Sequence, residues 1–116
     1  MPRAGVTQMP FSKLYPLLVS KAEKKGRTRE EVDQVTCWLT GYTPEALAQL
    51  EQSDTTYGDF FRNAPAMNPN RVLITGKVCG VRVEDIEDPL MQEIRYLDKL
   101  VDELAKGKAM EQILRR

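Results

Sequence analysis

The stretch DPLMQEIRYLDKLVDELAKG, residues 88–107, decides the fold of this chain. Its apolar positions recur at steps of four, three, four and three residues, which places them on one face of a helix. They are Leu90, Ile94, Leu97, Val101 and Leu104. Asp88 before Pro89 is a typical helix start, because proline suits the first helical position. Lys106 before Gly107 is a typical helix end. The stretch therefore predicts a long helix near the C-terminus.

The N-terminal third of the chain predicts two more helices. From Phe11 onward, apolar residues recur at three- and four-residue steps, and Gly26 ends the pattern. Thr28 lies three residues before Glu31, which is the spacing of a capping box at a helix N-terminus. A second helix is therefore expected over residues 29–40.

Shorter helical signals occur between and after these segments. Thr43 before Pro44 predicts a short helix that fades near Gln52, and Thr56 begins another short turn. A tail helix is expected around Met110. Two prolines close together after residue 63 predict a rigid linker rather than a helix.

Residues 72–83 fit two structures. Their β-branched side chains and the Gly76-Lys77 pair are typical of a β-hairpin. As a helix, Leu73, Ile74 and Val78 would share one face. Because the rest of the chain is helical and a lone hairpin is marginally stable, a helix is favoured here and the hairpin is kept as the alternative.

The predicted architecture is all-α, a compact single domain over residues 11–116 that follows an irregular arm over residues 1–10. We expect five or six helices, several of them short, with a long C-terminal helix. The chain has 116 residues, of which 41% are hydrophobic and 29% charged, so it is neither disordered nor membrane-embedded by composition. No apolar run approaches the roughly 18 residues of a membrane span. A cytoplasmic protein is therefore expected.

The residue types needed for common catalytic and metal sites are scarce. The chain has no His, which removes the usual near-neutral acid/base and the commonest metal ligand. Cys37 and Cys79 do not have the spacing of a zinc or redox motif and are interpreted as buried core cysteines. The acidic cluster at residues 84–88 is interpreted as helix capping. No catalytic residue, cofactor or metal ion is predicted, and an enzyme is the less favoured class.

The zero net charge conceals strong segregation along the chain. Residues 1–29 hold seven basic groups and one acidic group, whereas residues 30–61 hold seven acidic groups and no basic one. Five of the basic residues lie close together, namely Lys21, Lys24, Lys25, Arg27 and Arg29. This basic segment could bind an anionic partner such as nucleic acid. A solvated face whose charges pair with neighbouring helices is favoured, because the chain as a whole has no positive field.

The apolar stripe of the long helix also has two interpretations. Its heptad spacing, from Leu90 to Leu104, is typical of a homodimer seam formed by residues 89–104. Met91 and Leu100 widen the apolar face, and this width favours burial in the core of the same chain.

Several blocks of the sequence resemble an uncharacterised bacterial family. The blocks are KAEKKGRT at 21–28, WLTGY at 38–42, LITG at 73–76, VCGVRVEDI at 78–86, DPLM at 88–91 and IRYLDKL at 94–100. Together they are similar to domain-of-unknown-function family 2200, from about Met9 to the C-terminus. The resemblance implies a small bacterial cytoplasmic protein that forms one domain. It implies no catalytic residue, substrate or cofactor.

The leading functional hypothesis is a non-enzymatic interaction or regulatory module with an unspecified protein partner. Nucleic-acid binding through the basic segment is the first alternative, with a helix-turn-helix at residues 70–88 as its structural companion. A small-molecule site or enzyme around Tyr42, Cys79, Arg82 and Glu84 is the second, and it requires a pocket that joins these positions.

Overall fold

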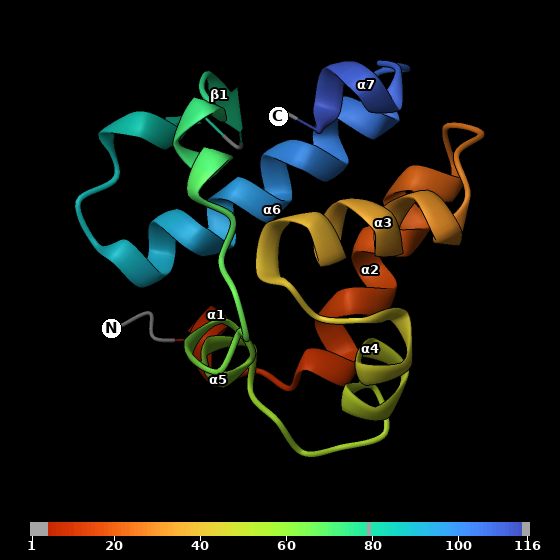
Figure 1. The fold of residues 1–116 in the computed structure, drawn as a ribbon, viewed down its shortest axis with the longest axis vertical. Coiled ribbons are helices and arrows are strands. Elements are labelled where there is room, and N and C mark those ends of the chain that lie inside the picture. Colours follow the sequence, from red (N-terminus) through yellow and green to blue (C-terminus); the bar gives the residue numbers. More distant parts are fainter. Residues whose placement is uncertain (1–4, 79, 115–116) are drawn as a thin grey trace.

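The structure is a computed structural model and describes residues 5–78 and 80–114 (Figure 1). Its helices are α1 (Gly5–Gln8), α2 (Phe11–Glu23), α3 (Arg29–Thr40), α4 (Pro44–Leu50), α5 (Tyr57–Arg62), α6 (Pro89–Ala105) and α7 (Met110–Ile113). Two short 3-10 helices, η1 (Pro69–Leu73) and η2 (Val83–Asp85), flank a pair of strands, β1 (Lys77–Val78) and β2 (Val81–Arg82). The predicted all-α class, with a long helix near the C-terminus, is confirmed.

Helix α6 is the central element of the fold. It runs diagonally through the middle of the molecule in Figure 1 and packs against α2, α3, α5, α7, β1 and η2. The Asp88 carboxylate caps its start by accepting a hydrogen bond from the Leu90 amide at 3.0 Å. Its apolar face, Ile94, Leu97, Leu100, Val101 and Leu104, is buried in the core. Burial of that face supplies most of the hydrophobic stabilisation of this helix.

Helix α3 is capped by different means at its two ends. At the N-terminus, the predicted capping box between Thr28 and Glu31 is present. At the C-terminus, Gly41 has a φ of 83°, and the linker, residues 63–68 between α5 and η1, crosses the last turn. There the Ala66 amide donates to the Thr40 carbonyl at 3.0 Å, and the Asn68 amide donates to the Leu39 carbonyl at 2.9 Å. The linker thus satisfies carbonyls that have no partner within the helix.

The favoured helix over residues 72–83 is wrong, and the hairpin alternative is right. The β1 and β2 strands pair antiparallel, with Lys77 opposite Arg82 and Val78 opposite Val81. The two strands are joined between Val78 and Val81 rather than at Gly76-Lys77, and the described residues of 70–88 form no helix-turn-helix.

Contact with α6 explains why this short hairpin is stable. Ile74, Val78 and Val83 are buried, and β1 and η2 pack on α6. The Lys99 ammonium of α6 also donates to the Lys77 carbonyl at 3.1 Å. An isolated hairpin is marginal in water, but this one is part of the core.

The described part of the predicted irregular arm, residues 5–10, contains a helical turn. Residues 5–8 form the single turn of α1, which packs against α5. The chain then pairs with the segment before α5, since the Phe11 amide donates to the Thr55 carbonyl and the Tyr57 amide donates to the Met9 carbonyl. Phe11 stacks on both Tyr15 and Phe60. These contacts hold the start of α2 against α5.

Candidate functional site

A pocket of about 280 Å³ opens beside α3 at the start of α4. It is lined by Glu30, Asp33, Gln34, Cys37 and Pro44, and we call it the α3–α4 pocket. Four of these residues follow one another at steps of three, one and three, so they lie on one face of α3. Pro44, the first residue of α4, also lines the pocket. The pocket therefore depends on how α4 is placed against α3.

Asp33 is held in place by groups on its inner side. The hydroxyl of the fully buried Tyr15 donates to Asp33 Oδ1 at 2.6 Å. Burial, and then the bond to Asp33, raise the pKa of Tyr15 well above its ordinary value, so the phenol keeps its proton and acts as a donor. On the other carboxylate oxygen, Arg29 Nε lies 3.7 Å from Asp33 Oδ2. Arg29 also forms an ion pair with Glu51.

The outer carboxylates of this region are not neutralised in the same way. Glu30 lines the pocket, and Glu45 follows Pro44 in the first turn of α4. Within residues 5–78 and 80–114, neither forms an ion pair. Burial raises the pKa of the Cys37 thiol, and the Asp33 and Glu45 carboxylates raise it further. The mouth of the pocket therefore has a negative potential.

The structure engages most of the basic segment in ion pairs. The paired residues are Lys21, Arg27 and Arg29. Arg27 makes two hydrogen bonds to the Glu31 carboxylate, at 3.1 and 2.7 Å, and a third to the Lys108 carbonyl at 2.8 Å. Lys24 and Lys25 are exposed at the end of α2. Within residues 5–78 and 80–114 neither lysine forms an ion pair. Two such lysines would form a much weaker anionic-partner patch than five.

The predicted dimer seam lies almost entirely in the core. Ile94, Leu97, Val101 and Leu104 are each at most 1% exposed, and Leu90 is half-buried at the start of α6. These side chains pack against other parts of the same chain. They are therefore not available as a surface for a second copy.

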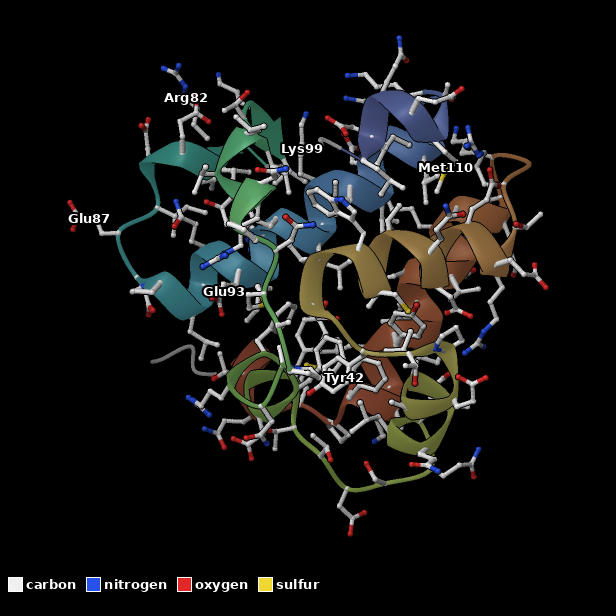
Figure 2. All side chains as sticks on the ribbon, viewed as in Figure 1. Tyr42, Arg82, Glu87, Glu93, Lys99 and Met110 are labelled. Carbon is white, nitrogen blue, oxygen red and sulfur yellow. The ribbon has the colours of Figure 1, made fainter. Side chains whose placement is uncertain are left out.

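The residues of the second alternative are not brought together. Tyr42 donates through its hydroxyl to the Phe60 carbonyl at 2.7 Å, in the aromatic cluster below α3. Arg82 lies at the hairpin, far from Tyr42 in Figure 2, and pairs with Glu84 at 3.5 Å. Cys79 lies outside the described residues. None of Tyr42, Arg82 and Glu84 lines the α3–α4 pocket.

Two general features of the described ranges bear on function. They contain no group of three or more His, Cys, Asp and Glu side chains placed to hold a metal ion. In addition, no helix within residues 5–78 and 80–114 combines the length and the apolar character needed to cross a bilayer.

Comparison with known proteins gives a family. The family model described as "Uncharacterized protein conserved in bacteria (DUF2200)" matches residues 5–115. The chain belongs to this family. It is also similar to the uncharacterized protein SP1917, whose crystal structure superposes with a TM-score of 0.93 at 54% identity. That match covers 97% of this chain and 93% of SP1917. A search of curated proteins finds no match.

Membership of DUF2200 assigns no functional site, so the choice of the α3–α4 pocket as the candidate site rests on its geometry alone. Sequence reasoning missed it, because Glu30, Asp33 and Gln34 have the pattern of an ordinary solvated helix face. The available signal was the continuation of that stripe to Cys37, a residue type that is more often buried. The sequence pattern does not show that Pro44 lies beside this stripe, because the position of Pro44 depends on tertiary structure.

Proposed function

We propose that this DUF2200 protein is a non-enzymatic binding module and that the α3–α4 pocket is its ligand site. The observation that carries the proposal is a concave, mostly apolar site lined by four residues from one face of α3 and by Pro44 of α4. Small-molecule sites commonly combine a mostly apolar concavity with a few convergent polar groups.

The chemistry of the pocket favours binding over catalysis. Burial, Asp33 and Glu45 raise the pKa of the Cys37 thiol, so the thiol form dominates at neutral pH. A thiol is a far weaker nucleophile than a thiolate. Asp33 is already engaged by Tyr15 and Arg29, and this fixes it as a hydrogen-bond acceptor.

The walls of the pocket are supported by contacts outside it. The capping box of Thr28 and Glu31 fixes the start of α3. At the other end, Gly41 and the linker hold the exit of α3 toward α4, and the Thr43 hydroxyl caps α4 by accepting from the Ala46 amide at 3.1 Å. A site that is already formed binds with a smaller loss of conformational entropy.

A fragment screen followed by backbone amide NMR tests the proposal. We expect binding fragments to shift the amide signals of residues 30–37 and 44–46 and to leave those of α7 unchanged. Gln34→Trp places a bulky ring at the pocket and should abolish these shifts. Gln112→Trp, at an exposed position of α7, is the matched control and should preserve them. Shifts that persist in Gln34→Trp, or that cluster elsewhere, would overturn the proposal.

A further inference from the structure

Building on the proposed pocket, we infer that its ligand is a small organic cation, an ammonium or guanidinium group on a short aliphatic chain. The inference rests on the proposed function and adds the chemical class of the ligand. It comes from three features of the pocket, namely its unpaired carboxylate, its mostly apolar wall and its size.

The charges around the pocket select a cation. Glu30 lines the pocket without an ion pair among the described residues, and the Asp33 carboxylate is oriented by Tyr15. Arg29 is the nearest basic group on α3, but it is engaged with Asp33 and Glu51. Residues 30–61 contribute no Lys or Arg at all. An anionic ligand would therefore be repelled, whereas a cation would gain a charge-assisted hydrogen bond.

The wall of the pocket selects an aliphatic body rather than a bare ion. The surface that faces the pocket is mostly apolar, with the ring of Pro44 beside the side chains of α3. A divalent metal ion prefers several oxygen ligands, and no such group occurs in the described ranges. An alkyl chain can cover the apolar wall while its charged end reaches Glu30.

The volume limits the size of the ligand. The pocket measures about 280 Å³, just below the roughly 300–1,000 Å³ typical of small-molecule sites. A short alkylammonium or alkylguanidinium group fits this volume. The same chemistry occurs in a free amine and at the end of a Lys or Arg side chain, so the experiment includes both sources.

Three probes with the same carbon chain isolate the effect of charge. Butylammonium chloride, 1-butanol and sodium butyrate are titrated at equal ionic strength, and the amide shifts of residues 30–37 give each Kd. We expect butylammonium to bind about tenfold more tightly than butyrate and several-fold more tightly than butanol. A short peptide with a single exposed Lys is titrated in parallel, and tighter binding of the peptide than of butylammonium assigns a protein source.

Variants of the carboxylates complete the test. Glu30→Gln should weaken butylammonium binding about threefold or more and leave butanol binding unchanged. Glu111→Gln, an exposed carboxylate on α7, is the matched control and should change neither. Equal affinities for the three probes at the pocket would overturn the cation inference while the proposed ligand site stands. If no probe shifts the pocket amides but other fragments do, the cation inference also fails alone. If nothing shifts them, the proposed function itself fails.

Discussion

The basic segment, Lys21 to Arg29, and the acidic α3–α4 region, Glu30 to Glu51, adjoin in the chain but end in different states. Arg27 and Arg29 are held by carboxylates, and little of their charge is left for a partner. Glu30 and Glu45, beside the pocket, form no ion pair with any residue that the structure describes. The number of like-charged residues is the same in the two regions, five basic ones in the first and five acidic ones in the second. The two regions differ in which oppositely charged side chains the tertiary structure places beside them.

In each region a glycine with a positive φ follows a helix, and the surroundings of the two glycines differ. Gly26 ends α2 with a φ of 84°, and a Cβ built there would meet nothing within 4 Å. Gly41 ends α3 with a φ of 83°, and a Cβ there would lie 2.8 Å from the Ala66 amide nitrogen. Thus the turn at Gly26 has open space around it, whereas the turn at Gly41 lies directly against the backbone of the linker.

Alanine at the two glycines should therefore give the largest difference between the regions. Gly26→Ala introduces only an unfavourable left-handed conformation, which costs about 1 kcal/mol. Gly41→Ala adds a clash with the backbone of the linker and should lower the free energy of unfolding by about 3 kcal/mol or more. Urea unfolding followed by circular dichroism measures both. Equal losses would contradict a tight contact at Gly41.

Tyr15→Phe tests the inner support of the pocket. The substitution keeps the stacking on Phe11 but removes the only hydroxyl that Tyr15 offers to Asp33. A hydrogen bond to a charged group contributes about 1.5–3 kcal/mol, so we expect a loss near 2 kcal/mol. The same urea experiment measures it. A loss below about 0.5 kcal/mol would mean that the bond is replaced by water.

Arg27→Gln and Lys24→Gln separate a paired cation from a free one. Arg27→Gln removes the bonds to Glu31 and Lys108 and should cost about 1 kcal/mol. Lys24→Gln removes an exposed charge and should stay within about 0.5 kcal/mol of the parent protein.

The cost of Arg27→Gln should also depend on pH. The hydrogen bonds from Arg27 lower the pKa of the Glu31 carboxyl below its ordinary value. The stabilisation is therefore complete above the ordinary carboxyl pKa and is lost as the pH falls through the lowered value. Measured from pH 7 downward, the difference between variant and parent should shrink. A constant difference would show that packing, not charge, explains the loss.

The same contrast explains how much of the molecule was predictable. The helix over 89–105 and the capping box at Thr28 depend on neighbouring residues, so their signals are complete in a short stretch of sequence. The hairpin depends on the surface of α6, against which Val78 and Val83 are buried. The local pattern fits both structures, and the helix is favoured from the sequence because the rest of the chain is helical and a lone hairpin is marginal. The α3–α4 pocket depends on a linker about 25 residues after Gly41. No local sequence pattern predicts that contact, although the residues that line the pocket can be read directly from the sequence.

The smallest expected effect concerns the reactivity of Cys37. In a Cys79→Ser background, Cys37 is the only thiol, because the chain has two cysteines. Burial, Asp33 and Glu45 together raise its pKa, so Glu45→Gln should lower that pKa toward the ordinary value. At pH 8 more of the thiol would then be ionised, and alkylation by iodoacetamide should accelerate, by less than about threefold.

Glu23→Gln, at an exposed position near the end of α2, is the matched control and should leave the rate of alkylation unchanged. An increase in both variants would indicate a general effect of net charge. An unchanged rate in Glu45→Gln would mean that Glu45 does not act on the thiol and that burial and Asp33 alone raise its pKa. In that case the negative potential at the mouth of the pocket, on which the preference for a cation depends, would be weaker than the geometry indicates.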